Sequence, residues 1–204
     1  MVRVTSEIGR LRRVLVHEPG AEVDRMVPAM MAQLLFDDIL YGDRAREEHG
    51  MFRRVLQLLG VDAVEVRDVL VETLEVDGAL DWLLDVLLLD LPSGLRRTMR
   101  EATPARVARA LVRGVRPDGP QRGPELADLF DLTPLPNWCF QRDPQVVLGG
   151  GVLFCAMASE ARHRESMLAR LMFRFHPQFA EVPVLFDPLR TCLLYTSPSP
   201  RDGT

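Results

Sequence analysis

The chain has 204 residues and a formal net charge of −4, from 25 Lys and Arg against 29 Asp and Glu. Its hydrophobic fraction of 47% and charged fraction of 26% are typical of a globular protein with its own core. The slight acidity excludes the basic footprint of a nucleic-acid-binding protein, and no apolar run approaches the roughly 20 residues that span a bilayer. The first residues lack the layout of a secretory signal, so we expect a cytoplasmic location.

The first part of the chain alternates strand and helix signals. Residues 12–17, RRVLVH, are β-branched and followed by a turn, which predicts a strand. A helical pattern over 24–42 has Pro28 near its start. A second helix is predicted over 44–60, where apolar residues recur at the spacing of one helix face. This helix face consists of Phe52, Val55, Leu56 and Leu59. A strand is predicted over 61–66.

The middle of the chain, residues 67–133, has no strand signals. TPARVARALVRG, residues 103–114, predicts a helix with Thr103 as N-cap and Gly114 at the end. Residues 117–124 are a turn-rich linker, and 125–132 predict a short helix. We interpret 67–133 as a helical insertion between two strand-bearing parts.

Strand signals return after Pro144. Two apolar runs around GGG predict a hairpin over 145–157. A helix over 160–175 and a strand over 181–187 follow. The order strand, helix, strand, helical segment, hairpin, helix, strand predicts an α/β or α+β fold.

The last residues, CLLYTSPSPRDGT, do not continue this pattern. Their Ser- and Pro-rich composition is typical of a disordered terminus. The string also resembles translated vector or adapter sequence. Our hypothesis is therefore that native sequence stops near Arg190 and that 191–204 form a non-native or disordered tail; sequencing past this codon tests it.

PLPNWCFQRDP, residues 134–144, is the most unusual stretch. Its prolines stiffen the loop, and Asp143 with the nearby aromatic rings would suit a guanidinium or ammonium group. Composition alone favours a connecting loop whose aromatic residues cap the core, by about two to one.

The same stretch resembles the PLPNxxFxRDP signature of the arginine deiminase family. SEIGRLRRVLVHEPGAEVDRMVP, LLFDDILYG, and GGGVLFCAMASEARHRES followed by FRFHP resemble further family segments, in family order. Members of that family also carry a helical insert. The resemblance implies a partial α/β-propeller, or pentein fold, built of ββαβ units. Residues 1–66 and 134–190 would belong to the propeller and 67–133 to the inserted helical subdomain.

The resemblance also implies site residues. Asp143 occupies the position of the catalytic aspartate that binds the substrate guanidinium. Asn137 and Phe140 match residues that line the substrate site, Arg162 matches the arginine that binds the substrate carboxylate, and Arg142 matches the motif arginine in a supporting role.

The activity implied is hydrolysis of L-arginine to L-citrulline and ammonia through an amidino-cysteine intermediate, with no metal or organic cofactor. The family's second carboxylate, histidine and nucleophilic cysteine have no counterpart in this chain. We therefore expect the chain to be truncated and inactive alone, and a possible homo-oligomer when full length. Cys139 and Cys155 are interpreted as buried hydrophobic residues, with Cys192 in the tail, and the four histidines as structural or surface residues. The alternatives are an amidinotransferase or methylarginine hydrolase of the same superfamily, or a non-catalytic protein that binds guanidino compounds.

Overall fold

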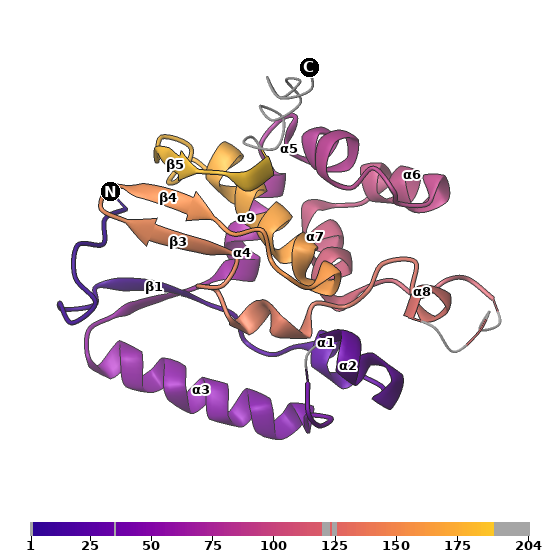
Figure 1. The fold of residues 1–204 in the computed structure, drawn as a ribbon, viewed down its shortest axis with the longest axis horizontal. Coiled ribbons are helices and arrows are strands. Elements are labelled where there is room, and N and C mark those ends of the chain that lie inside the picture. Colours follow the sequence, from indigo (N-terminus) through magenta and orange to yellow (C-terminus); the bar gives the residue numbers. More distant parts are fainter. Residues whose placement is uncertain (1, 35, 120–122, 124–125, 190–204) are drawn as a thin grey trace, which may run out of the picture.

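A computed structural model of the chain describes residues 2–34, 36–119, 123 and 126–189. The fold is α/β, with two small sheets and a group of helices (Figure 1). The proposed tail, residues 191–204, lies outside the described residues. Among the described residues, no helix is both long and apolar enough to cross a membrane.

The first sheet pairs β1, Arg13–Val16, with β2, Asp62–Glu65, in parallel. The two strands are connected through α3, Gly42–Leu58, which lies along the first sheet (Figure 1). Both strands and α3 lie within two residues of their predicted bounds. Gly60, with φ of +74°, ends the helical segment, a conformation that favours glycine.

The predicted helix over 24–42 is wrong as a continuous element. The structure has α1, Ala21–Asp24, a 3₁₀ turn η1, Pro28–Met30, and α2, Met31–Leu34, while residues 36–41 are not helical. Pro28 explains the first break: the residue before a proline is forced out of the helical region, and Val27 is extended with ψ of 156°.

The second sheet has the order β3–β4–β5. β3, Gln145–Leu148, and β4, Gly151–Phe154, form the predicted antiparallel hairpin, and β5, Val184–Phe186, pairs in parallel with β4. The long helix α9, His163–Phe175, lies between β4 and β5 in the chain. This segment is therefore a β-β-α-β unit.

The described residues between β2 and β3 are mainly helical. The elements are α4 (Val66–Leu74), α5 (Ala79–Trp82), the π-helical turn η2 (Leu83–Leu87), α6 (Ser93–Glu101), α7 (Pro104–Arg113), α8 (Leu126–Leu129) and the 3₁₀ turns η3 (Pro136–Cys139) and, after β4, η4 (Glu160–Arg162). α4 packs against both α7 and α9.

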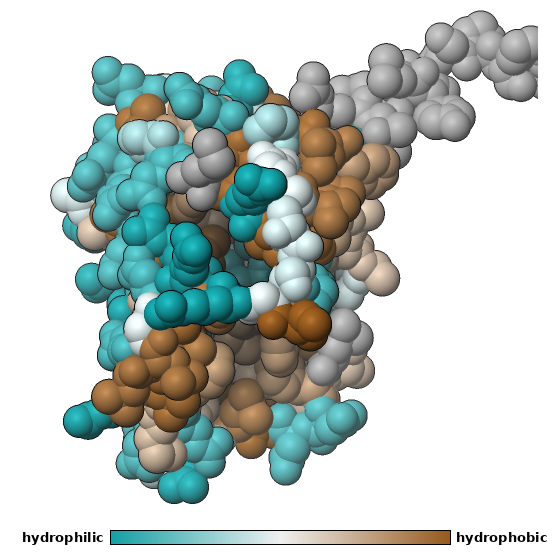
Figure 2. Space-filling view, turned by 90° about the vertical axis from the view of Figure 1, so that its left-hand side faces the viewer, coloured by the Kyte–Doolittle hydropathy of each residue, from teal (hydrophilic) through white to brown (hydrophobic). Residues whose placement is uncertain are grey.

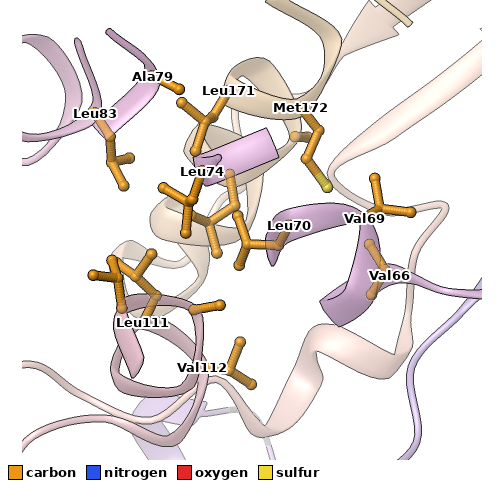
Figure 3. Packing of buried hydrophobic residues seen from close by; sticks show 14 of the residues in the cluster. Val66, Val69, Leu70, Leu74, Ala79, Leu83, Leu111, Val112, Leu171 and Met172 are labelled. Atoms are coloured by element: carbon orange, nitrogen blue, oxygen red, sulfur yellow. The ribbon is translucent and has the colours of Figure 1, made fainter. Parts of the chain in front are cut away.

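The main core joins this helical segment to the second sheet. Figure 3 shows side chains of α4, α7 and α9 pointing toward one another, and Leu70, Leu111, Leu168 and Leu171 are all 0% exposed. Burying one such side chain contributes roughly 1.5–3 kcal/mol. One apolar cluster therefore includes residues of α4, α5, α7, β4 and α9.

Most of the predicted apolar face of the α3 segment does not pack inward. Phe52 and Val55 are each 54% exposed and Leu59 is 67% exposed, whereas Leu56 is partly buried, as are Arg46 and Arg53. Arg53 faces the first sheet and donates to the carbonyl of Ala63 at 3.4 Å. Apolar side chains accordingly gather in the lower part of the face shown in Figure 2, at the height of α3.

Candidate functional site

The 134–144 stretch is fixed to the end of α7. Gly114 follows α7 with φ of +76° and ψ of 164°, and the next residue, Val115, forms an isolated β-bridge with Leu132. The chain thereby returns alongside α7, and the amide of Leu135 donates to the carbonyl of Val112 at 2.9 Å. These backbone contacts set where the proline-rich loop begins.

The side chains in and just after the 3₁₀ turn η3 differ in burial. Asn137 is 4% exposed, and its Nδ2 donates to the carbonyl of Leu34 in α2 at 2.7 Å. Trp138 is 1% exposed, whereas Phe140, just after the turn, is 52% exposed. The loop is thus a rigid wall with one open aromatic ring.

Asp143 and Arg162 are brought together although 19 residues separate them. Arg162 Nη1 donates to Asp143 Oδ2 at 2.8 Å, and the guanidinium carbon of Arg162 lies 5.9 Å from the centroid of the Phe140 ring. The Asp143 side chain remains 47% exposed, whereas that of Arg162 is 11% exposed. A carboxylate beside an aromatic ring therefore already holds one guanidinium here.

Glu165 holds Arg162 from the opposite, buried side. Arg162 Nε donates to Glu165 Oε1 at 3.0 Å and Nη2 donates to Oε2 at 2.7 Å, which is a two-pronged contact. Burial raises the pKa of Glu165, although the bonds from Arg162 oppose the shift. Burial disfavours the charge of Arg162, but the carboxylates of Glu165 and Asp143 outweigh it and raise the pKa of Arg162 above its ordinary value.

Arg142 extends toward the N-terminal segment. Its guanidinium donates to both carboxylate oxygens of Glu7, at 2.9 and 3.0 Å, and both side chains are largely exposed. An exposed pair of this kind contributes about 0–1 kcal/mol. Arg142 therefore contacts a different segment from Asp143, and its supporting role stays a prediction.

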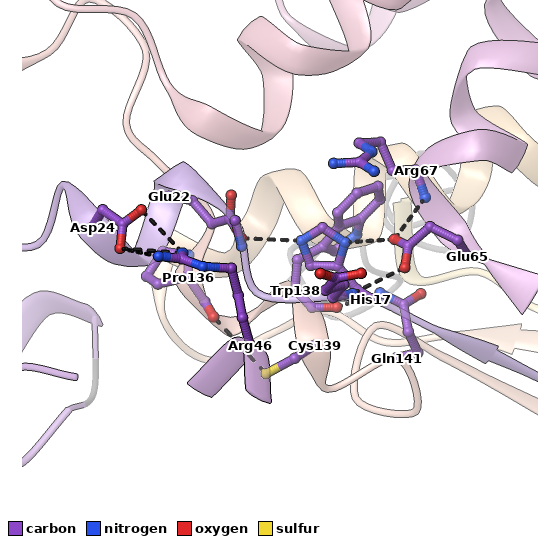
Figure 4. Close-up of polar contacts among 12 residues, drawn as sticks. His17, Glu22, Asp24, Arg46, Glu65, Arg67, Pro136, Trp138, Cys139 and Gln141 are labelled. Carbon is purple, nitrogen blue, oxygen red and sulfur yellow. Dashed lines mark hydrogen bonds and ion pairs between the residues drawn. The ribbon is translucent and has the colours of Figure 1, made fainter. Parts of the chain in front are cut away.

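A buried ionic cluster lies behind η3 (Figure 4). His17 follows β1, and its Nδ1 lies 2.9 Å from Glu65 Oε1 while its Nε2 lies 3.2 Å from Glu22 Oε1. All three side chains are at most 4% exposed. The imidazole centroid lies 4.8 Å from that of the Trp138 ring system, with the planes tilted by 55°.

The two cysteines in the described part of the chain are partly buried thiols. Burial raises the pKa of Cys139 to about 11, and its Sγ donates weakly to the carbonyl of Pro136 at 3.9 Å. Cys192 lies outside the described residues. In the same described part, no group of three or more His, Cys, Asp or Glu side chains is arranged to hold a metal ion.

Sequence reasoning missed two features of this region. Glu165 lies three residues after Arg162, at the spacing of neighbours on a helix, and that spacing was the available signal. Glu65 carried no local signal, because it meets His17 only after β1 and β2 pair, and Glu22 meets His17 through the turn between β1 and α1.

Comparisons with known proteins identify the family of this chain. The family model described as arginine deiminase matches residues 32–191. The chain is 32% identical to the arginine deiminase of Metamycoplasma hominis over an alignment of 197 residues that covers 92% of this chain and 48% of that protein. It is also 32% identical to the arginine deiminase of Limosilactobacillus fermentum, over 88% of this chain and 48% of the relative. The arginine deiminase of Metamycoplasma arthritidis gives the same identity over 92% of this chain. The chain spans about half the length of these curated relatives, and it belongs to the arginine deiminase family.

Proposed function

We propose that the complete protein containing this chain hydrolyses L-arginine to L-citrulline and ammonia through an amidino-cysteine intermediate, and that Asp143 binds the substrate guanidinium. The supporting observation is the contact of Arg162 with Asp143 beside the open ring of Phe140. The same carboxylate and ring could receive the guanidinium of a free arginine, because the recognition chemistry is identical.

The proposed binding requires an exchange of partners. Asp143 would release Arg162 and take the substrate guanidinium, while Arg162 would keep Glu165 and bind the substrate carboxylate. The two-pronged contact with Glu165 supports this, because Nε and Nη2 stay fixed while Nη1, which now contacts Asp143, becomes available. In this proposal Asn137 and Phe140 line the substrate site and Arg142 supports the loop.

The nucleophile of the proposed reaction is neither Cys139 nor Cys155. A thiol with a pKa of about 11, as Cys139 has, is ionised to roughly one part in 10⁴ at pH 7, and the thiolate is the attacking species. Cys155 lies on the strand side of α9, where its carbonyl accepts a hydrogen bond from Ser166. Cys192 belongs to the hypothesised non-native tail. We therefore propose that the nucleophile belongs to a part of the protein outside this sequence and that the 204-residue chain alone has no deiminase activity.

We also propose that the β3–β4–α9–β5 segment is one unit of an α/β-propeller and that residues 67–133 form an inserted helical subdomain. The β-β-α-β order of the segment supports the first point. The run of helices between β2 and β3 supports the second, although those helices share their core with α9.

The test is the substitution Asp143→Asn in the complete protein, with Asp90→Asn, an exposed change on the helical segment, as the matched control. Loss of one hydrogen bond between charged groups costs roughly 1.5–3 kcal/mol, so we expect kcat/KM for L-arginine to fall about 10- to 10²-fold. Citrulline and ammonia are the measured products. Near-native turnover by Asp143→Asn would break the assignment, and transfer of the amidino group or arginine binding without turnover would favour an amidinotransferase or a binding protein.

A further inference from the structure

His17 is held between two carboxylates at both of its ring nitrogens. A neutral imidazole has one N–H and one lone pair, so it can donate to only one of two carboxylates, and the other contact would place two lone pairs together. Both contacts are favourable only when both nitrogens carry a proton. The geometry therefore requires an imidazolium or a protonated glutamic acid.

The surroundings of the two glutamates favour the imidazolium. Glu65 Oε2 accepts from the amide of Glu18 at 3.0 Å, and Glu22 Oε1 accepts from the amide of Gly20. Oxygens that accept several N–H groups are stabilised as ionised carboxylates. Burial alone would raise the pKa of both glutamates, but hydrogen bonds from His17 and the backbone outweigh this effect. The pKa of each glutamate is therefore lowered from its ordinary value.

Each element packed on His17 contributes a group to this balance. α1 supplies Glu22 and the end of β2 supplies Glu65, both anionic, and η3 supplies the uncharged Trp138. α3 supplies His49, whose pKa is lowered by burial; the charges of Glu65 and Glu18 oppose this shift, and those of His17 and Arg53 add to it. Burial also opposes the charge on His17, but the two carboxylates outweigh it and raise the pKa of His17 above its ordinary value.

The His17 ring is in contact with the wall of the proposed arginine site. The His17 ring lies 4.8 Å from the Trp138 ring, inside the roughly 6 Å range over which a cation is attracted to an aromatic face. Trp138 lies between Asn137, which is fixed to α2, and Phe140, whose ring is open. A displacement of Trp138 would move both neighbours.

We propose that His17, as an imidazolium between Glu22 and Glu65, is a positioning residue that holds Trp138 and thereby the η3 turn in place. The inference rests on the proposed function only for the roles of Asn137 and Phe140; the charge state of His17 and its hold on Trp138 stand without it. Loss of the proton removes one of the two hydrogen bonds and the attraction to the indole, so η3 loosens at high pH.

The first measurement is the protonation of His17 in the ¹⁵N-labelled 204-residue chain, read from the NMR shifts of both ring nitrogens between pH 5.5 and 9. The urea-unfolded chain is the reference, where histidine titrates near its ordinary pKa of about 6.5. We expect both nitrogens of folded His17 to be protonated at pH 7.5, where the unfolded reference is mostly neutral. A neutral His17 in the folded chain at pH 7.5 overturns the proposal.

The second measurement compares Glu22→Gln with Glu18→Gln, which removes the same charge from an exposed side chain next to His17. In Glu22→Gln we expect the midpoint of His17 protonation to move to lower pH, and the indole N–H signal of Trp138 to shift with the same midpoint. Glu18→Gln should keep the native midpoint. If the indole N–H signal of Trp138 does not shift with the midpoint of His17 protonation, the positioning role is overturned. If Glu22→Gln does not fold, the same comparison is made in the native chain, by following the Trp138 signal across the pH range in which His17 loses its proton. None of these readouts depends on turnover of arginine.

Discussion

Gly114 is the residue whose substitution should most directly disturb the start of the site loop. With φ of +76° and ψ of 164° it occupies a backbone region that is essentially open to glycine alone, and forcing another residue there costs roughly 1–3 kcal/mol. A Cβ at this position would also lie 2.6 Å from the Leu132 carbonyl oxygen and 2.6 Å from the Pro134 nitrogen. Both are backbone atoms, so the returning chain itself must move.

Two other glycines separate these contributions. Gly149 has φ of +59° with nothing within 4 Å of its virtual Cβ, so Gly149→Ala should carry only the conformational cost of about 1–2 kcal/mol. Gly94, in α6, has ordinary helical φ and open space, so Gly94→Ala should stabilise the chain by about 0.4–1 kcal/mol. For Gly114→Ala we expect a loss of about 3 kcal/mol or more, because the overlap adds to the conformational cost.

Equilibrium urea unfolding, followed by circular dichroism, gives the free energy of unfolding of the native 204-residue chain and of the three variants. From most to least stable, the expected order is Gly94→Ala, the native chain, Gly149→Ala and Gly114→Ala. If Gly114→Ala and Gly149→Ala lose the same stability, the close approach of residues 132–134 does not constrain the loop and the reasoning fails.

Two further predictions concern the core and the ionic site. Leu70→Ala should lower the free energy of unfolding by about 2–5 kcal/mol, because Leu70 is fully buried between α7 and α9. The control Leu89→Ala, at a site 62% exposed, should change it by less than about 1 kcal/mol. Equal losses of stability in urea unfolding would contradict the core as described. Glu165→Gln should destabilise the chain by about 1–3 kcal/mol, because Arg162 keeps its charge and loses its buried ionic partner. The control Glu160→Gln, at an exposed position, should leave the free energy of unfolding unchanged. If Glu165→Gln also leaves the free energy of unfolding unchanged, Asp143 alone suffices to hold Arg162.

The strands and α9 could be located from the sequence because their signals are local. Glycine stops and alternating apolar residues gave the bounds of β1 and β2 within one residue and those of the hairpin within three. The segment after Val27 could not be predicted as well, because its apolar residues continue a helical period past the point where Pro28 redirects the backbone.

The direction in which α3 faces could not be read from its pattern. Helical spacing predicts that Phe52, Val55 and Leu59 lie on one face, but it does not show whether that face packs against the core or is exposed. Arg53 faces the sheet instead, and Arg46 pairs with Asp24 of α1 and with Asp43 of α3 itself. The site shows the same limit: Asp143 and Arg162 were predicted by resemblance, whereas the spacing of Glu165 from Arg162 is compatible with a contact but does not show that Glu165 is the buried partner.

β5 has a consequence for how the isolated chain behaves in solution. Its three residues, Val184, Leu185 and Phe186, are 40–53% exposed, and in the described part of the chain the strand pairs with β4 on one side alone. An apolar strand with free backbone N–H and C=O groups is a template for pairing with another molecule. Self-association of the 204-residue chain through this strand should therefore increase with protein concentration, and a lysine at Leu185 should reduce it.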